Sequence, residues 1–389
     1  MEIVTLGDLF KISSGGTPSR REKSYYDNGD IPWIKTGDLH KVRIQQASEY
    51  ITQLGLDKSS AKLFPKDTVL LAMYGATIGA CSRLDIEAAT NQACAAFVPN
   101  EKVDTNYLYY FLKSKKNDFI RDGVGGAQPN ISATYLKTVD FPLPPLETQK
   151  QIAAVLEKAD QLRKDCQQME QELNSLAQSV FIDMFGDQLT SPHDVLGNVS
   201  NVVSGVTKGQ KHNNKVIVKA PYMRVANVQA GYLNLNEIKE IEVKESDIEK
   251  YKLEVGDVLL TEGGDHDKLG RGAIWNGEID NCIHQNHVFR VRLDTELYTS
   301  QWFNGYLKTD FAKRYFLKCA KKTTNLASIN ITQLKGLPMP DIDIKEQVRF
   351  ETIMTSINSQ MLSNTELAHQ YDENFYALMQ KAFKGELNL

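Results

Sequence analysis

The most regular apolar spacing in the chain lies near its middle. Over this stretch the apolar residues step alternately by three and four positions for about four heptads, which is typical of a helix that packs against another helix. The residues at this spacing are Ile152, Val155, Ala159, Leu162, Cys166, Met169, Leu173, Leu176 and Val180. We therefore predict a long helix over 146–186, with Thr148 and Gln151 as a capping box near its start.

The same pattern returns 198 residues later. The corresponding positions are Phe350, Ile353, Ile357, Gln360, Asn364, Leu367, Tyr371, Asn374 and Leu378, in which three amides interrupt the apolar seam. Buried amides can fix the register of paired helices while lowering their stability. A single apolar stripe usually means a helix packed on its own domain, but a seam of this length present twice favours two helices that pair with each other.

The direction of that pairing follows from the order of the segments. The first helix leads from one globular segment to the next, and the second helix begins at that next segment. It can therefore pair with the first only by running back, so the pair is predicted to be antiparallel. A helix of about 39 residues spans ~58 Å, which makes the pair a candidate spacer of defined length.

The repeat extends far beyond the helices. "LGDLFKISSGGT" at Leu6 matches "LGNVSNVVSGVT" at Leu196, and "DTVLLAMYG" at Asp67 matches "GDVLLTEGG" at Gly256. The offset drifts from about 190 to 198 through such pairs, and "ISATYLK" is answered at 198 by "INITQLK". The chain is thus two copies of one unit.

Each copy begins with a segment of mixed secondary structure. Short β-rich runs ("TVLLAM", "VLLTE", "HVFRVRL") lie between Gly, Asn and Pro turns, and helical stretches follow ("TNYLYYFLKSKKNDFI", "TSQWFNGYLKTDFAKRYFLKC"). The predicted fold class is α+β: two similar mixed α/β domains in a pseudo-two-fold arrangement, separated by two long helices that form an antiparallel coiled coil. The predicted segments are 1–145, 146–186, 187–341 and 342–389.

Composition narrows the classes of protein to consider. The five cysteines form no CxxC pattern, so neither a disulfide framework nor a zinc site is indicated. No run of apolar residues is long enough for a membrane helix, and the first residues lack the regions of a signal peptide, so we expect a cytoplasmic protein. The spacing of His266, His284 and His287 resembles no common metal-ligand set, and we expect no metal and no cofactor.

Charge is segregated along the chain although the net charge is only −4. Residues 195–236 contain five basic residues and no acidic one, whereas 237–257 carry eight acidic residues against four lysines. Residues 308–322 hold six basic groups and only Asp310 against them. Local basic loops of this kind are typical of contacts with the DNA backbone.

Two similar domains held a fixed distance apart suit the reading of two separated DNA half-sites, because both domains then bind one molecule at once. Basic loops would attract phosphates, and hydroxyls, amides and Arg at loop tips would read base edges. Gly-rich loops more often simply make tight turns, but here they occur at equivalent places in both copies. The candidate DNA-binding residues are Ser14, Gly16, Thr17, Arg20, Arg21, Lys23, Tyr74, Gly75, Thr77, Gly126, Gln128, Asn130, Thr207, Lys208, Lys211, His212, Asn213, Lys215, Gly264, His266, Lys268, Arg271, Lys321, Lys322, Thr323 and Asn325. Asn91-Gln92 and Gln285-Asn286 are interpreted mainly as structural amides.

Three motifs together resemble the specificity subunits of type I restriction-modification systems. They are the "PLPPLETQKQI" exit repeated as "LPMPDIDIKEQ", the "LGDLFKISSGGTPS" to "IPWIKTGDL" opening, and the "L-x-x-G-D-V-L-L" strand. The resemblance covers essentially the whole chain. It implies two target-recognition domains, each reading one half of a bipartite asymmetric DNA site. It also implies two helices that set the gap and dock methyltransferase subunits, two in number, with nuclease/translocase subunits joining the complex.

The resemblance also implies which helix residues meet each other or the methyltransferase: Ile152, Val155, Leu162, Met169, Leu173, Leu176, Phe350, Ile353, Ile357, Leu367 and Leu378. The second exit departs from the first and its helix is more polar, so the two docking surfaces need not be equivalent.

The chain shows no chemistry of its own. It contains neither an NPPY-type segment to hold a flipped adenine nor a phosphate-binding loop of an ATPase. We therefore expect a non-catalytic DNA reader. Two alternatives stay open: a specificity subunit whose partner fuses nuclease and methyltransferase, and a scaffold whose repeated domains bind protein.

Overall fold

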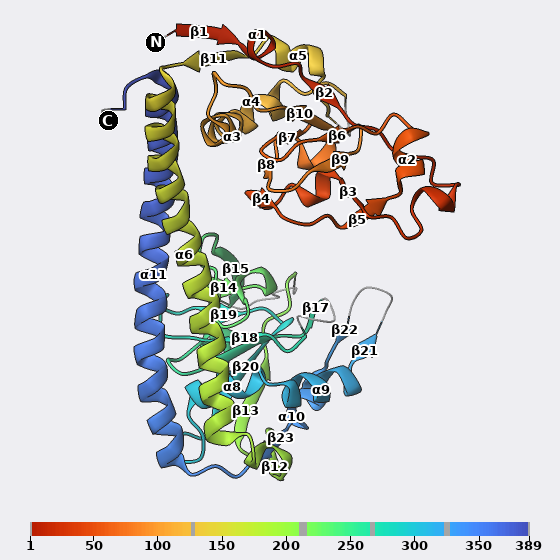
Figure 1. Cartoon of the computed structure of the whole chain (residues 1–389). Helices are drawn as coiled ribbons and strands as arrows, with labels where there is room; N and C mark the ends of the chain where they lie inside the picture. Colours follow the sequence, from red (N-terminus) through yellow and green to blue (C-terminus); the bar gives the residue numbers. More distant parts are fainter. Residues whose placement is uncertain (1, 126–128, 210–215, 265–268, 323–326, 388–389) are drawn as a thin grey trace. The chain divides into compact units, whose positions relative to one another are not determined.

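The computed structural model describes residues 2–125, 129–209, 216–264, 269–322 and 327–387 (Figure 1). The chain forms two compact units. Unit 1 is Met1–Gln167 with Glu366–Leu389, and unit 2 is Gln168–Thr365. Each unit contains a globular α+β part and one half of each of two long helices, α6 (Leu146–Phe185) and α11 (Ile344–Lys384). The four predicted functional segments are a finer division, which stays a prediction.

The two long helices pack against each other and run antiparallel. In unit 1 the first half of α6 shares a core with the second half of α11, where Leu156 belongs to the same cluster as Phe375. In unit 2 the second half of α6 meets the first half of α11 through Phe181 and Phe350, whose ring centroids are 5.4 Å apart. The predicted antiparallel helix pair is confirmed.

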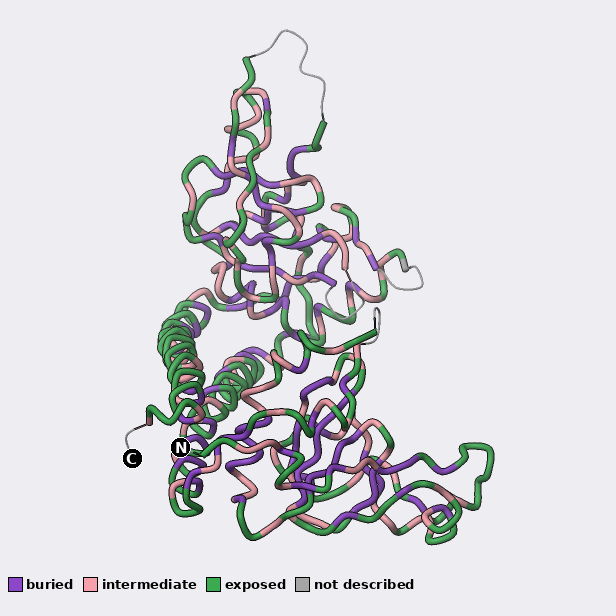
Figure 2. The backbone as a smooth tube through the Cα atoms, turned by 90° about the horizontal axis from the view of Figure 1, so that it is seen from above, coloured by how far each residue is buried: buried purple, intermediate pink, exposed green. Residues whose placement is uncertain are grey.

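Two details of the helix prediction are wrong. Helix α6 begins at Leu146, so Thr148 lies inside its first turn and does not cap it. The strict three-four seam also fails, because Leu162, Met169 and Leu176 are 36%, 46% and 48% exposed, and Leu367 of α11 is 43% exposed. Much of the outer surface of both helices is exposed in Figure 2.

The buried face of each long helix packs against two neighbours, the other long helix and a globular part, rather than against one. Ile152, Leu156 and Leu173 are buried on α6 because that face meets both α11 and a globular part. Cys166 is buried as well. Among the other seam positions, Phe350 and Ile357 are buried, while Val155, Ile353 and Leu378 are partly buried. A straight α-helix has 3.6 residues per turn, so a face shared in this way drifts away from a 3.5-residue seam.

The globular part of unit 1 is built on small sheets. One has the strand order β2-β10-β7-β8-β4, a second has β5-β3-β9-β6, and β1 pairs with β11. The strands are β1 (Glu2–Thr5), β2 (Ser13–Ser14), β3 (Ile31–Ile34), β4 (Arg43–Ile44), β5 (Glu49–Ile51), β6 (Leu63–Phe64), β7 (Val69–Ala72), β8 (Cys81–Leu84), β9 (Ala88–Thr90), β10 (Cys94–Phe97) and β11 (Asp140–Leu143). The helices are α1 (Leu6–Leu9), α2 (Gln53–Asp57), α3 (Thr105–Ser114), α4 (Lys116–Arg121) and α5 (Ala133–Lys137), with short 3₁₀ turns η1 (Lys23–Tyr25), η2 (Thr36–Asp38) and η3 (Gly75–Thr77).

Unit 2 repeats this plan. Its main sheet has the order β13-β20-β16-β18, a second has β15-β14-β19, and β12 pairs with β23. The strands are β12 (Pro192–Val195), β13 (Ser200–Ser204), β14 (Ile217–Met223), β15 (Lys239–Lys244), β16 (Val258–Thr261), β17 (Gly263–Gly264), β18 (Gly272–Ile274), β19 (Ile283–His284), β20 (Val288–Leu293), β21 (Lys321–Lys322), β22 (Ala327–Ser328) and β23 (Pro338–Pro340). The shorter helices are α7 (Glu245–Tyr251), α8 (Ser300–Leu307), α9 (Asp310–Cys319) and α10 (Ile331–Lys335), with 3₁₀ turns η4 (Gln188–Thr190) and η5 (Val225–Asn227).

The helical stretches predicted as continuous are each broken once. Helix α8 ends at Leu307, and the Thr309 hydroxyl accepts a hydrogen bond from the Ala312 N–H to start α9. A threonine in extended conformation satisfies the free N–H groups of a new helix, so the chain turns there instead of continuing. In unit 1 the break falls at Lys115, between α3 and α4.

One buried glutamine fixes the start of each long helix to its own globular part. The Gln149 side-chain oxygen accepts a hydrogen bond from the Asp104 N–H at 2.9 Å, and its Nε2 donates to the carbonyls of Lys102 and Pro144. In unit 2 Gln347 makes the same three bonds to Thr299, Leu297 and Ile342. The glutamines of the two repeated exit motifs thus occupy the same structural position.

Candidate nucleic-acid interface

The Ser-Gly loop of each copy is held against a neighbouring strand by very close backbone approach. A Cβ on Gly15 would lie 1.9 Å from the Thr90 carbonyl oxygen, and a Cβ on Gly205 would lie 2.0 Å from the His284 carbonyl oxygen. The next residue then donates its N–H to the same carbonyl, at 2.9 Å from Gly16 and 2.8 Å from Val206. The loop after β2 and the loop after β13 therefore follow one backbone path up to Thr17 and Thr207.

Gly16 has a structural role in this loop. It is buried, and a Cβ there would lie 2.1 Å from the Ser60 hydroxyl oxygen. Its carbonyl accepts a hydrogen bond from the Trp33 indole at 3.0 Å. Gly16 therefore serves close packing, and its contact with DNA stays a prediction.

Three further segments meet at the same end of the main sheet in unit 1. After β7, the Met73 N–H donates to the Ala93 carbonyl at 2.8 Å and the Met73 carbonyl accepts from the Ile131 N–H at 3.0 Å. Tyr74 then pairs with Asn130 as an isolated bridge, and the Gly75 N–H donates to Pro129. The predicted residues Tyr74, Gly75, Thr77 and Asn130 are thus brought together beside the loop that carries Thr17.

Unit 2 brings the equivalent segments together in the same way. We call the place where these segments meet, at one end of the main sheet, the junction of each unit. The Glu262 N–H donates to the His287 carbonyl at 3.0 Å, and the Glu262 carbonyl accepts from the Ile329 N–H at 2.9 Å. The short strand β17 then pairs with β22, which pairs with β21. This places Gly264, Lys321 and Lys322 on one small sheet at the end of unit 2.

The polar side chains at the two junctions differ. In unit 1 the Thr17 hydroxyl donates to the Gln92 side-chain oxygen. In unit 2 the Glu262 carboxylate and the His287 imidazole nitrogen Nδ1 are 2.5 Å apart, and both side chains are at least partly exposed. An amide and a hydroxyl in one unit and an ionisable pair in the other offer different hydrogen-bonding groups to a base edge.

Arg20 is the basic residue of the first loop that the structure fixes most firmly. Its guanidinium lies 2.6 Å from Glu49 and 4.5 Å from the ring centroid of Tyr26. Glu49 is also bound by Lys35, and the two cations lower the pKa of the Glu49 carboxyl, with the Lys35 hydrogen bond the largest cause. Arg20 is therefore held ready in one orientation.

The remaining candidates fall into three groups. Ser14 pairs with Ala95 in the sheet, while Arg21, Lys23, Thr207 and Lys208 are exposed. Arg271 faces a cavity in unit 2 and not the junction. The predictions for Gly126, Gln128, Lys211, His212, Asn213, Lys215, His266, Lys268, Thr323 and Asn325 lie outside the described residues.

Sequence reasoning gave little weight to Gln92, Glu262 and His287, which the structure brings to the junctions. For Gln92 and His287 the signal was the alignment of "TNQACAAFVP" with "IHQNHVFRVR", which puts both residues at the same turn. For Glu262 it was the alignment of "DTVLLAMYG" with "GDVLLTEGG". Among the described residues, no three His, Cys, Asp or Glu side chains gather as a metal-ligand set. His284 is instead buried, with its Nδ1 2.7 Å from the Val288 carbonyl.

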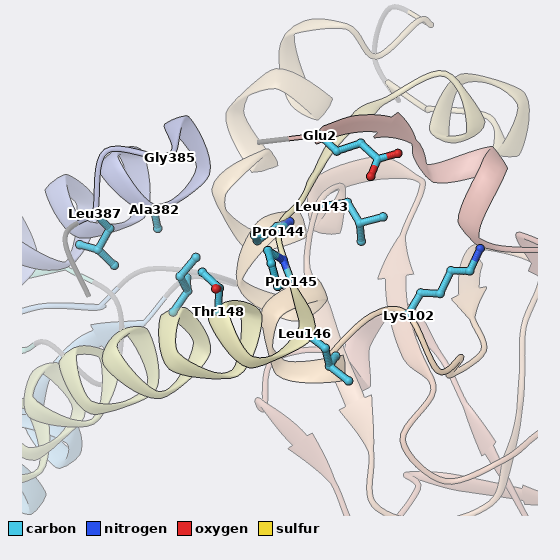
Figure 3. Close-up of a pocket in the computed structure, with 11 residues that line it drawn as sticks. Glu2, Lys102, Leu143, Pro144, Pro145, Leu146, Thr148, Ala382, Gly385 and Leu387 are labelled. Atoms are coloured by element: carbon cyan, nitrogen blue, oxygen red, sulfur yellow. The ribbon is translucent and has the colours of Figure 1, made fainter.

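A cavity of about 710 Å³ opens in unit 1 where the start of α6 meets the end of α11 (Figure 3). The proline-rich exit 143–146 lines it together with Ala382, Gly385 and Leu387. In unit 2 the position that corresponds to Leu387 under the 198-residue shift is Leu189, which is buried in the core of that unit.

None of the described helices carries an apolar stretch long enough to cross a membrane. The fold and the two junctions thus define a duplicated protein with an antiparallel helix pair and two similar, differently tipped polar surfaces.

Comparison with known proteins finds relatives that span the whole chain. Residues 1–175 match the family model of the type I restriction modification DNA specificity domain. The chain is 24% identical to the MjaIX specificity subunit of Methanocaldococcus jannaschii, over 100% of this chain and 94% of that protein. It is 23% identical to the EcoKI specificity subunit of Escherichia coli, over 96% of this chain and 86% of that protein.

Solved structures share the fold. The S subunit of a type I restriction-modification system from M. genitalium superposes with a TM-score of 0.55 at 18% identity, covering 98% of this chain and 96% of that one. A chain from a structure of complex assembly in the type I system gives 0.59 at 16% identity, covering 99% and 98%. Over its whole length the chain is thus similar to specificity subunits of type I restriction-modification systems.

Proposed function

We propose that this chain is the DNA-recognition subunit of a type I restriction-modification complex, with each unit reading one half of a bipartite, asymmetric site. The observation that carries the proposal is the pair of junctions, which share one backbone framework but present different polar side chains. A common framework with different tips is what two readers of different half-sites require. The chain would position catalytic partners and perform no reaction itself.

The decisive test is a methylation map. Expressing the chain with its methyltransferase and locating N6-methyladenine across a genome should give a two-part motif with a fixed gap. Replacing residues 1–145 with the corresponding segment of another specificity subunit should change one half of that motif only. A change in both halves would contradict the modular assignment, and methylation without a two-part motif would contradict the function.

The helix pair would set the gap between the half-sites. Inserting one heptad after Gln167, with a matching insertion in α11 at the start of its second half, should widen the gap while keeping both half-sites. Matching both insertions preserves the antiparallel register that the cores of the two units require. An unchanged gap would mean that the helices do not determine the spacing.

Methyltransferase subunits, two in number, would dock on the exposed faces of the helices, and nuclease/translocase subunits would join through them. In unit 2, Met169, Leu176 and Ile182 are large apolar residues of α6 that are 46%, 48% and 51% exposed. Changing Met169 and Leu176 to Glu should abolish methyltransferase binding in size-exclusion chromatography while leaving the thermal midpoint nearly unchanged, because neither side chain is buried. Leu173→Ala, on the buried face, is the matched control and should lower stability instead.

A two-subunit system with a fused nuclease-methyltransferase partner would place the chain in the same role, and the copurifying partner distinguishes the two arrangements. A protein-binding scaffold would lack the steep fall of DNA affinity with salt that phosphate contacts produce.

A further inference from the structure

Unit 2 contains a polar cavity away from the junction described above. Its volume is about 400 Å³, and it is walled by α6, by the loops 229–232 and 269–272, and by α8 and α9. Its polar lining includes Asn174, Gln178, Arg271, Asn304, Lys308 and Lys313. This set contains three cations and no carboxylate.

The lining carries polar groups that the described part of the chain leaves without partners. Asn304 is 6% exposed, and its buried side-chain oxygen accepts no hydrogen bond from a described residue. The buried Nε of Arg271 likewise finds no described acceptor, and its Nη1 lies 3.4 Å from the Gln229 side-chain oxygen. Buried polar groups are usually satisfied, so an unfilled set of this kind points to a ligand.

In unit 1 the equivalent place is filled by side chains of the protein itself. Lys113 lies nine residues after the helix cap Asp104, and Lys308 lies nine residues after the equivalent cap Thr299. The Lys113 Nζ is 3.0 Å from Asp160 and 5.0 Å from the ring centroid of Phe375. Asp160 is only 2% exposed, so this lysine is neutralised inside the unit.

Nearby charges in unit 1 are paired as well. Arg163 binds both Asp160 and Asp372, and its guanidinium lies 4.6 Å from the ring centroid of Phe375. Acidic groups and an aromatic ring thus fill the space around the cations.

The second copy has lost these groups. Under the 198-residue shift that relates the long helices, the correspondences are Asp160 with Asn358, Asp372 with Asn174 and Phe375 with Ala177. The shared strand register aligns β8 with β18, so that Ala80 corresponds to Arg271. The same shift pairs Arg163 with Met361. Two carboxylates, a ring and one arginine are therefore removed, one arginine is added, and the lysine is kept.

We propose that this cavity of unit 2 binds a phosphate group, which takes the place of the carboxylates that unit 1 supplies from its own chain. Lys308 and Arg271 would hold the charged oxygens, since charge-assisted bonds to phosphate are the strong ones. The Asn304 side-chain oxygen would accept a hydrogen bond from a P–OH group or a ligand hydroxyl. The volume suits a small phosphorylated molecule.

The environment of Lys308 agrees with this assignment. A Cβ on Gly231 would lie 2.7 Å from the Lys308 Nζ, so the ammonium group lies close against the backbone at Gly231. Part of the Lys308 side chain stays exposed, yet burial lowers the pKa of its ammonium group, and no described carboxylate opposes this effect. A bound phosphate would supply the missing negative charge.

The test uses the full chain and inorganic phosphate, with chloride at matched ionic strength as the reference. Isothermal titration should show phosphate binding, and phosphate should raise the thermal midpoint of the wild type. Lys308→Met should weaken binding about tenfold or more, the loss expected for one charge-assisted hydrogen bond. Asn174→Asp should weaken it similarly, because it returns to the cavity a carboxylate of the kind that unit 1 has.

The matched control is Lys113→Met in unit 1, which should leave phosphate affinity unchanged and lower the thermal midpoint, because it removes one of the three cations that bind the buried Asp160. Displacement of phosphate by a DNA duplex would identify the DNA backbone as the source of the phosphate group. Binding that a duplex does not affect would identify a free phosphate monoester, independently of the proposed function. No phosphate binding by the wild type, or equal affinity in wild type, Lys308→Met and Asn174→Asp, would overturn the proposal.

Discussion

The two units differ least where the long helices begin and most at the far end of their main sheets. Gln149 and Gln347 make the same three hydrogen bonds to equivalent backbone groups. At the junctions, by contrast, Thr17 and Gln92 stand where unit 2 has Thr207 and the Glu262–His287 pair. The shared framework therefore depends on a backbone geometry that few side chains permit. The side chains at the junctions, by contrast, can differ between the two units.

The shared helix start gives the largest expected effect. Changing Gln149 to Ala leaves one buried N–H and two carbonyls without partners, and we expect unit 1 to lose about 3–5 kcal/mol of stability. Gln347→Ala should destabilise unit 2 to the same extent. Hydrogen exchange read by mass spectrometry, peptide by peptide, would show which unit opens. Unequal losses would mean that the two positions are not structurally equivalent.

Acid should lower the stability of unit 2 more than that of unit 1, because the buried His284 of unit 2 corresponds to Thr90 of unit 1. Burial is the main cause that lowers the pKa of His284, to about 4. The unfolded chain binds the proton more readily, so the stability of unit 2 is fully present above about pH 6.5 and falls by about 3 kcal/mol as the pH drops towards 4.

Denaturant unfolding from pH 7 to 4.5, followed by exchange in each unit, measures this difference. His284→Gln should flatten the profile of unit 2, because it removes the buried imidazole. An equal acid response in both units would contradict the assignment to His284.

The sequence predicted the architecture because duplication can be seen without coordinates. The match of Leu6 with Leu196 and the seam repeated at 198 residues imply two α+β units and an antiparallel helix pair. The exposure of Met169 and Leu176 was not predicted, since spacing alone does not show that a helix face is shared between a partner helix and a globular part.

The candidate interface was less predictable, because its residues come from segments far apart in the chain. Thr17, Gln92 and Asn130 meet only after three loops reach one end of a sheet. Gly16 shows a second difficulty, since a glycine needed for close packing has the same appearance in sequence as one that lets a ligand approach.

Changes at the two equivalent loop glycines should cause a smaller loss of stability, of similar size in the two units. Gly15→Ala and Gly205→Ala each place a methyl group about 2 Å from a backbone carbonyl oxygen, which must shift. Overpacking of this kind destabilises by about 1–3 kcal/mol. Thermal unfolding of the two variants should give similar losses. Gly37→Ala is the control, because nothing lies within 4 Å of a Cβ at that exposed position. A large loss in only one variant would show that the two loops do not share a backbone path.

The smallest effect on stability is expected for Arg20. The same residue gives the sharpest test of a loop in the candidate interface. Its pair with Glu49 is half exposed and Lys35 also binds Glu49, so Arg20→Ala should change stability by less than about 1 kcal/mol. If Arg20 reaches a phosphate, the same change should weaken binding to all DNA sequences alike and reduce the salt slope by about one. If it reads a base, affinity should fall for the cognate half-site and the slope should hardly change. Affinity that is unchanged for every sequence would remove Arg20 from the interface and leave it a purely structural partner of Glu49 and Tyr26.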